Sequence, residues 1–279
     1  MPSRDGVDEF GKSVKDRLAN RLILNVPGRG RNEVLKKVIE RVNEDDELYA
    51  YWIAANVNAV ERLGMTDHGP VHVKIVMNIA DKLFRILTTQ GVQPGVVTNY
   101  DMTLDEAEIV VVIAALLHDI GMSIHRADHE AFSLFIAQDK ARHLLDGLYD
   151  RATATVLRSE ILHAIIAHRS GGKPLTLEAG IVRVADALDM AKGRSRIPFS
   201  AGSMSIHSLS AAAIEAVHIE PGEAKPVRLR IELTNSAGIF QLDQLFREKL
   251  AGSGLEQYIE LEADLIGEAE KRLVGSFRL

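Results

Sequence analysis

The 279-residue chain contains no cysteine. Disulfide bonds and thiolate metal sites are therefore excluded, since both require cysteine sulfur. Any metal ion must instead be held by histidine, aspartate or glutamate, a donor set that suits divalent Mn, Fe, Mg, Ni, Co or Zn. The placement of the 10 histidines is consequently the first question that the sequence raises.

A hydrophobic run long enough to cross a membrane is also missing. The longest apolar run, from Ile109 to Leu117, is shorter than the roughly 20 residues that a membrane-spanning helix needs. The segment MPSRDGVDEFGKSVKDR is polar and of mixed charge, unlike a signal peptide. We therefore expect a cytoplasmic protein with no membrane partner.

The chain has no excess of positive charge, since its net charge is −6. Because a general nucleic-acid-binding surface is basic, a nucleic-acid partner is not expected. The content of 46% hydrophobic and 26% charged residues is that of an ordinary globular protein. This composition excludes the disordered and fibrous classes.

The pattern of the chain is helical up to about Arg196 and changes after Gly202. We expect a mainly α fold, in which an all-helical domain is followed by a small C-terminal α+β domain. The predicted parts are an N-terminal helical segment (1–55), the helical domain (56–200) and the small domain (205–279). The GRGR run at residues 28–31 is interpreted as a loop rather than as a phosphate cradle.

Two helices of the expected helical domain have clear start and stop signals. Pro70 begins one, apolar residues follow at helical spacing, and Gly91 ends it. Thr103 and two acidic residues begin the other, which continues as EIVVVIAALL into His118. Being apolar nearly all round, it is expected at the centre of the domain, with Gly121 in a left-handed turn after it. Further helices are predicted at His129–Leu145, Thr153–His168 and Glu178–Ala191.

The C-terminal part alternates with the period of a half-buried strand. In PVRLRIEL the apolar residues fall on one face and the charged residues on the other. AIEAVHIE is the expected partner strand, a helix is expected at Ile239–Leu250, and a third strand around Gln257–Ala263. This order predicts a small β-β-α-β layer. Arg228 and Arg230 could meet an anion on its exposed face, but a solvated strand face is the expected reading.

His118 and Asp119 end the apolar central helix. A charged carboxylate beside an imidazole at the end of a buried helix needs compensation, because an unpaired buried charge is costly. A metal ion supplies that compensation. Asp186 raises the same question on another apolar helix, with Asp189 one turn further on. An internal salt bridge or a capping network is the alternative for Asp186.

The other histidines differ in how well they are placed to reach such a site. His68 precedes the helix that Pro70 begins, and His72 follows four residues later. That spacing can chelate one metal, and we favour His68 as the ligand and His72 as a supporting or surface residue. His163 and His168 are separated by about 140° on a regular helix, so both cannot point into one site. We favour His168, which precedes a glycine-containing turn, and place His163 in the core.

The order His68, His118–Asp119, Asp186 resembles the HD-domain superfamily of metal-dependent phosphohydrolases. The strings ALLHDIG, HEAFS, AIIAHRSGG and RVADALD are similar to that superfamily too. The resemblance covers roughly Asn56 to Arg196 and leaves the β-containing tail outside. It implies that a metal-activated water attacks a phosphoester or phosphoanhydride of a small molecule, a nucleotide being the expected class.

The resemblance also implies which residues bind metal. A first divalent ion is expected on His68, His118, Asp119 and Asp186. His129 and His168 match the positions that bind a second ion in the two-metal branch, in which the aspartate of the HD pair bridges both ions. Asp119 and His118 would then be the catalytic pair, with Mn, Fe or a similar ion.

Met122 departs from the family pattern, because many phosphodiesterase members carry a lysine there. The cation for the substrate phosphate must then come from elsewhere, and the candidates are Lys173, Lys192, Arg194 and Arg196. The alternative for the last three is that they favour the C-terminus of the preceding helix. GGKP stands where the cyclic-dinucleotide phosphodiesterases have GYP, so that assignment is not supported.

Two further functions stay open at this point. One is a di-iron oxygenase on the same scaffold. The other is a catalytically silent metal-binding module that regulates or senses, with the tail responding to a ligand or partner. The tail could also form the surface of a homodimer.

Overall fold

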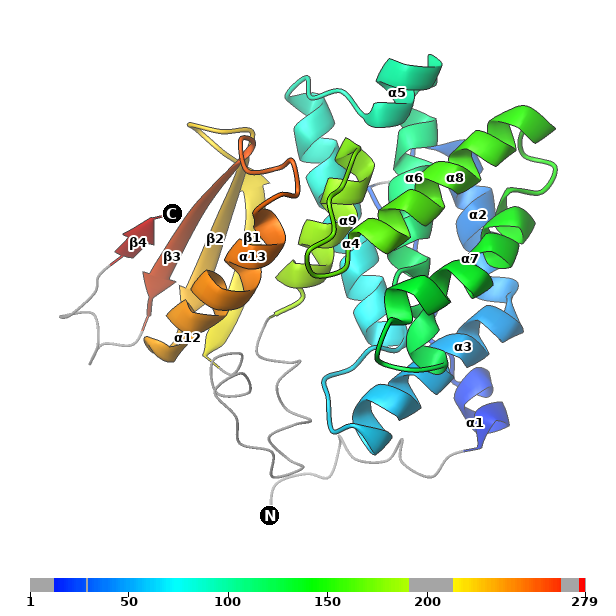
Figure 1. Cartoon of the computed structure of the whole chain (residues 1–279), viewed down its shortest axis with the longest axis horizontal. Coiled ribbons are helices and arrows are strands. Elements are labelled where there is room, and N and C mark those ends of the chain that lie inside the picture. The colour runs from blue at the N-terminus through cyan, green and yellow to red at the C-terminus, as the bar shows by residue number, and fades with distance from the viewer. Residues whose placement is uncertain (1–12, 29, 191–212, 267–275, 279) are drawn as a thin grey trace.

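The computed structural model describes residues 13–28, 30–190, 213–266 and 276–278. Helices make up one side of the molecule and a four-stranded sheet the other (Figure 1). The expected mainly α fold with a C-terminal α+β layer is confirmed. None of the helices among these residues has the length and hydrophobicity that a membrane crossing requires.

The N-terminal part consists of short helices around an extended loop. They are α1 (Val14–Ala19), α2 (Glu33–Glu44), α3 (Asp46–Asn56) and the π-helical turn η1 (Val57–Arg62). The described residues of the GRGR run, Gly28, Gly30 and Arg31, lie in the loop between α1 and α2, as predicted. Gly28 and Gly30 have φ of 60° and 59° there, a left-handed conformation that favours glycine.

Helix α6 (Leu104–Leu117) lies at the centre of the helical part, as its apolar sequence predicts. It is buried from Ala107 to Leu117. Thr103 and Glu106 form the capping box at its start, so two backbone N–H groups at that end are satisfied. Helices α4 (Pro70–Thr89), α8 (Arg151–Ala167) and α9 (Leu177–Leu188) pack against it, and the short α5 (Gly95–Tyr100) precedes it.

The turn after α6 differs from the prediction. Gly121 lies in the 3-10 helix η2 (Ile120–Ser123) and does not have a left-handed φ. The glycine is needed there for another reason. A Cβ at Gly121 would lie 2.1 Å from the His129 carbonyl oxygen and 2.4 Å from the Ser133 nitrogen. The backbone of helix α7 (His129–Leu145) therefore packs directly against the backbone of the turn. This packing places His129 next to Asp119.

The C-terminal layer has the predicted β-β-α-β order and one strand more. Strands β1 (Ile214–Pro221) and β2 (Val227–Leu233) are antiparallel, and β3 (Ile259–Leu265) runs parallel to β2. Between β2 and β3 lie α12 (Ala237–Phe240), the π-helical η3 (Gln241–Phe246) and α13 (Arg247–Leu250). The unpredicted strand β4 (Ser276–Arg278) pairs with β3 at the sheet edge.

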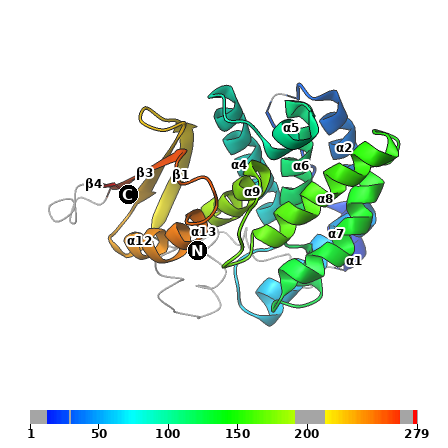
Figure 2. The ribbon, with the colours of Figure 1, turned by 45° about the horizontal axis from the view of Figure 1, so that its top comes forward.

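The layer and the helical part share one hydrophobic core. Buried residues of β2 and β3 alternate with half-buried ones, and the buried faces belong to the same cluster as α4, α6 and α9. Helix α13 lies next to α9, between that helix and the sheet (Figure 2). This contact brings the C-terminal layer close to the carboxyl end of α9. The domain boundaries given above stay a prediction.

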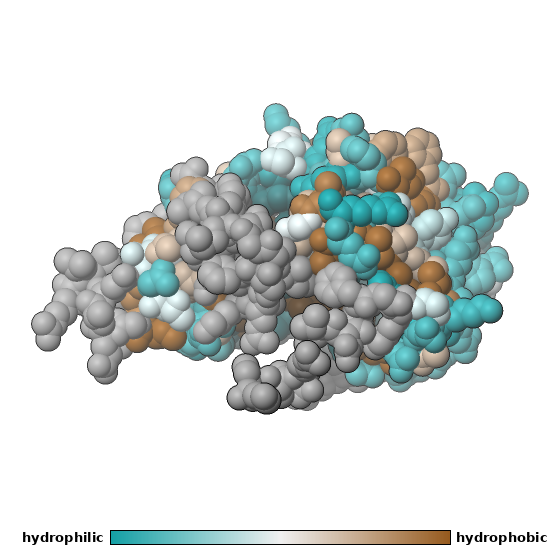
Figure 3. All heavy atoms as spheres, turned by 90° about the horizontal axis from the view of Figure 1, so that it is seen from below, coloured by the Kyte–Doolittle hydropathy of each residue, from teal (hydrophilic) through white to brown (hydrophobic). Residues whose placement is uncertain are grey.

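The exposed face of the sheet is neutralised by its own ion pairs. Arg228 pairs with Glu220 and Glu223, and Arg230 pairs with Glu232 at 2.9 Å. The arginines therefore have carboxylate partners already, which favours the solvated strand face over an anion site. On the face seen from below, hydrophobic and hydrophilic residues are interspersed over the helical part (Figure 3).

Candidate metal centre

The end of α6 carries the first two residues of the centre. His118 caps the helix, Asp119 directly precedes η2, and both side chains are buried. Nδ1 of His118 donates to the Ala115 carbonyl at 2.8 Å. Because this bond uses Nδ1, the other ring nitrogen, Nε2, is the one that faces the surrounding donors.

A first group of four residues converges on this point: His72, His118, Asp119 and Asp186 each offer a ligand atom within 4.8 Å of the others. The Nε2 atoms of His72 and His118 are 3.2 Å apart. They lie 3.3 Å and 3.4 Å from Asp119 Oδ2, and each is 3.7 Å from Asp186 Oδ1. Two imidazoles and two carboxylates in this arrangement can surround one divalent ion.

His72 rather than His68 lies in this group, which differs from our sequence interpretation. Helix α4 begins at Pro70, so its first turn carries His72 into the interior, where only 1% of the residue is exposed. His68 lies before the helix, and its Nε2 is 4.0 Å from Asp119 Oδ2. The geometry therefore favours His72 as the ligand and places His68 at the side of the group.

Asp189 supports His72 from behind and was not assigned a role from the sequence. Its Oδ2 lies 2.6 Å from Nδ1 of His72, and both residues are buried. A carboxylate on the far nitrogen of a metal-binding histidine fixes the ring orientation and makes the ligand more basic. In the sequence, only the spacing of one helical turn from Asp186 pointed to Asp189. Its partner His72 lies 117 positions away, so no local pattern connects the two.

A second group consists of Asp119, His129 and His168. Nε2 of His129 is 3.0 Å and Nε2 of His168 is 3.5 Å from Asp119 Oδ1. The other oxygen, Oδ2, faces His72 and His118 in the first group. The two oxygens of one carboxylate thus point to two different donor groups. Such a carboxylate can bridge two ions.

The two histidines of the second group are held differently on their Nδ1 side. Nδ1 of His168 donates to the Ile165 carbonyl at 2.6 Å, as Nδ1 of His118 does to Ala115. Nδ1 of His129 lies 2.8 Å from the Arg126 guanidinium, 3.1 Å from the Arg126 carbonyl and 3.2 Å from a Glu130 carboxylate oxygen. His163 points elsewhere, because its Nε2 accepts a hydrogen bond from the Leu175 nitrogen. The structure therefore places His168 in the centre. His163 lies outside it and is half-buried, so its expected place in the core is wrong.

Ser133 connects the turn after α6 to α7. Its hydroxyl donates to the His118 carbonyl at 2.7 Å and accepts from the Gly121 nitrogen at 2.8 Å. Together with the close packing of Gly121, these bonds fix α7 against the end of α6. The separation of His129 from the HD pair is thereby set by backbone contacts rather than by flexible side chains.

Opposite charges dominate the electrostatics of the centre. Burial lowers the pKa of His118, but Asp119 and Asp186 outweigh it and raise that pKa to about 10. Burial raises the pKa of Asp119, but His118, His129 and His168 hold it well below its usual range. Burial, with smaller effects of neighbouring cations, lowers the pKa of His168. Two ionised carboxylates therefore require positive charge, which a proton on His118 or a divalent ion can supply.

The donor set fits divalent metal. It contains only imidazole nitrogens and carboxylate oxygens, and it is largely buried. Nδ1 of His118 and of His168 donates to a backbone carbonyl, and Nδ1 of His72 contacts Asp189. This is the support that metal-binding histidines normally have. Nitrogen and oxygen donors without sulfur suit Mn, Fe and similar ions.

Of the expected substrate-binding cations, Lys173 lies among the described residues. Met122 is fully buried and packs against Ala55, Ala59 and Val60, so position 122 faces the core and not the centre. Lys173 is exposed in the loop between α8 and α9. The remaining candidates, Lys192, Arg194 and Arg196, lie outside the described residues.

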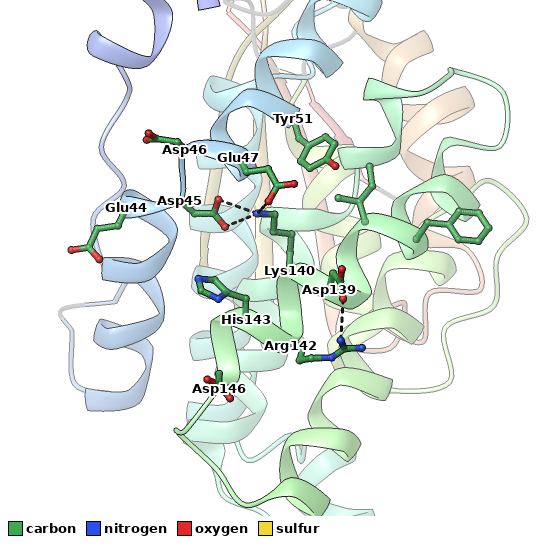
Figure 4. Close-up of a pocket in the computed structure, with 12 residues that line it drawn as sticks. Glu44, Asp45, Asp46, Glu47, Tyr51, Asp139, Lys140, Arg142, His143 and Asp146 are labelled. Carbon is green, nitrogen blue, oxygen red and sulfur yellow. Dashed lines mark hydrogen bonds and ion pairs between the residues drawn. The ribbon is translucent and has the colours of Figure 1, made fainter. Parts of the chain in front are cut away.

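A cavity of about 850 Å³ is lined by residues of α2, α3 and α7. Figure 4 shows these side chains. In this cavity, acidic residues lie around Lys140, whose ammonium pairs with Asp45 and Glu47 at 2.8 Å and 2.7 Å. None of its lining residues belongs to the two donor groups. Because Lys140 is already paired, this cavity contains a structural ion pair and gives no sign of chemistry.

Two comparisons with known proteins agree with this geometry. Residues 69–191 match the family model of the HD domain. The uncharacterized protein MJ1020 of Methanocaldococcus jannaschii is 39% identical over 228 residues, which is 82% of this chain and 88% of that protein. The matched segment contains every residue of the two donor groups.

Proposed function

Since the chain belongs to the HD-domain family, we propose that it is a metal-dependent phosphohydrolase acting on a phosphoester or phosphoanhydride, with nucleotides as the substrate class. The observation that carries this proposal is the position of Asp119. Its Oδ1 faces His129 and His168, and its Oδ2 faces His72 and His118. One carboxylate between two donor groups is what a two-ion hydrolytic centre needs.

The proposed ligands follow from the two groups. A first ion would be held by His72, His118, Asp119 and Asp186, and a second by Asp119, His129 and His168. His68 is proposed as a flanking residue rather than as the first ligand. Bound ions would supply a water of lowered pKa as nucleophile and would neutralise the phosphate.

The residues of the chain have separate tasks in this proposal. Asp119 and His118 hold the nucleophilic side of the centre, and Asp189 keeps the His72 ring in the orientation that presents Nε2. His72 and His118 are buried, so bulk water is kept away from them. This strengthens each electrostatic contact with the substrate.

Elemental analysis of the freshly purified chain, paired with a phosphate-release screen over nucleotides and dinucleotides, tests the proposal. We expect one or two Mn, Fe or similar ions per chain and release of phosphate from at least one compound class. Asp119→Ala should lose metal and turnover together, whereas Asp139→Ala, an exposed aspartate beside the large cavity, should keep both.

Other outcomes separate the alternatives. Iron with oxygen consumption and no phosphate release would favour the di-iron oxygenase. Tightly held metal without turnover on the whole panel would favour the silent module. Metal-dependent turnover that persists in Asp119→Ala would overturn the assignment of the centre.

A further inference from the structure

Lys249 of the C-terminal layer reaches the edge of the metal centre. Its Nζ lies 3.4 Å from Asp186 Oδ2, while Oδ1 of the same carboxylate faces His72 and His118. Nζ also donates to the His168 carbonyl at 2.7 Å. The ammonium group therefore contacts one residue of each donor group.

Lys249 lies on the open side of the centre. The side chains of His72 and His118 are fully buried, whereas 18% of Asp186 and 24% of Lys249 are exposed. A ligand that enters from solvent beside Asp186 therefore meets the Lys249 ammonium. An ammonium group has three N–H donors, and the two contacts above occupy two of them.

A buried arginine holds Lys249 in this place. Arg183 lies one turn before Asp186 on α9, and only 2% of it is exposed. Its guanidinium donates to the carbonyls of Glu248 and Lys249 at 3.1 Å and 2.7 Å. It also donates to the Arg169 and Gly172 carbonyls that follow His168, at 2.9 Å and 2.6 Å. One side chain thus joins α13, α9 and the end of α8.

Close backbone packing supports the same contact. A Cβ at Gly180 would lie 2.4 Å from the Ser253 carbonyl oxygen, so α9 and the loop after α13 approach to a distance that glycine permits. Ser170, two residues after His168, also hydrogen bonds to Glu248. The layer is therefore docked on the helices that carry Asp186 and His168.

The charge arrangement points to an anionic ligand. Once Asp186 helps to bind a divalent ion, an ammonium group beside it is repelled by that ion at short range. An anion between them offsets this repulsion, and a phosphate group has the charge and the acceptor oxygens to do so. Position 122, close to the HD pair in sequence, supplies no cation, because it is a buried methionine that faces the core.

We propose that Lys249 is the phosphate-binding cation of the metal centre, so that the C-terminal layer completes the substrate site of the helical part. This inference rests on the proposed function and names the residue that contacts the phosphate of the same site. It also assigns a task to the layer, which lies outside the segment that matches the HD domain.

Binding of inorganic phosphate to the manganese-loaded full chain, measured by isothermal titration calorimetry, tests the inference. Lys249→Met should weaken phosphate binding about 10- to 100-fold, the range expected for one charged hydrogen bond, with unchanged metal content. Lys249→Arg should stay within about threefold of the wild type, because it keeps the charge. Lys249→Gln should repeat the loss if the methionine variant does not fold.

Lys225 provides a matched control. It belongs to the same layer, and its Nζ donates to the Glu256 and Ile259 carbonyls at 2.7 Å and 2.8 Å. Lys225→Met should leave phosphate binding unchanged. Equal phosphate affinity in Lys249→Met and wild type would overturn the inference, and so would parallel loss of metal and phosphate, which would make Lys249 a structural partner of Asp186. Absence of phosphate binding to the wild type would overturn it too.

Turnover distinguishes this inference from the proposed function. If no compound is hydrolysed but Lys249→Met loses phosphate binding, the anion site stands and the hydrolase proposal fails. If the wild type hydrolyses a nucleotide and Lys249→Met has the same kcat/KM, the hydrolase proposal stands and the role of Lys249 is wrong.

Discussion

The helical part and the C-terminal layer place their charged side chains differently. On the sheet, Arg230 and Glu232 pair at 2.9 Å, and both are partly exposed. Exposed pairs of this kind neutralise one another and contribute little to stability. In the helical part, Asp119 and His118 are buried together and share their charges with two donor groups. Charged side chains of this protein therefore indicate a functional site where several of them are buried and face one point. Charged side chains that pair with a neighbour at the surface do not.

A large effect is expected at His72 and a small one at the neighbouring His68. His72→Ala should weaken metal binding more than about a hundredfold, beyond the loss typical of a supporting residue. His68→Ala should cost less than about tenfold, because His68 lies outside the four-residue donor group, with its Nε2 4.0 Å from Asp119 Oδ2. Metal titration of both variants measures this. The reverse order would restore His68 as the ligand that the sequence favoured.

A smaller effect is expected from the residue behind His72. Asp189→Asn keeps the size of the side chain but weakens its hold on Nδ1 of His72. Metal affinity should fall about 10- to 100-fold, as it does when such supporting carboxylates are changed. Asp264→Asn, on the half-buried face of β3 and outside both donor groups, is the control and should bind metal as the wild type does. An unchanged affinity in Asp189→Asn would remove Asp189 from the site.

A proton on His118 competes with the metal, so the affinity for metal should depend on pH. This effect should be similar to or smaller than that of Asp189→Asn. The pKa of His118 in the metal-free protein is raised to about 10 by Asp119 and Asp186, against the effect of burial. Metal binding must release that proton. The affinity for metal should therefore increase as the pH is raised towards about 10, by at most about tenfold per pH unit. Calorimetry in buffers of different ionisation enthalpy counts the proton. A flat affinity between pH 7 and 9 would contradict this account.

The same protonation affects the stability of the metal-free protein. The folded pKa of His118 lies above its unfolded value of 6.5. Its contribution to stability is therefore fully present below pH 6.5 and is lost as the pH rises towards 10. Denaturant unfolding of the metal-free chain between these pH values should show the loss, and saturating metal should reduce it.

The smallest effect is expected on the sheet. Arg230→Ala removes an exposed ion pair with Glu232 and should change the free energy of unfolding by less than about 1 kcal/mol. Metal content and turnover should be unchanged. A large loss of phosphate binding in this variant would show instead that the exposed arginines form an anion site.

Much of the fold follows from local signals in the sequence. The apolar run that ends in His118 predicts a central buried helix, and Pro70 marks the first residue of α4. The strand of PVRLRIEL begins at Val227 and ends at Leu233, as the alternation predicts. These features depend on residues within a few positions of one another, which is where capping and periodicity act.

Features that depend on distant contacts could not be predicted. Whether His68 or His72 enters the centre depends on where α4 begins and on which way the His72 ring points from its first turn. Gly121 is required by the approach of α7 rather than by its own φ. Lys249 reaches Asp186 from 63 positions away, through packing that no local pattern contains.

Metal titration of single-site variants of the full chain tests the central claim most directly. The account predicts two binding events in the wild type and none in Asp119→Ala. His72→Ala should keep the event that depends on His129 and His168, and His129→Ala should keep the one that depends on His72 and His118. Two undiminished events in Asp119→Ala would contradict the claim that one carboxylate joins both sites.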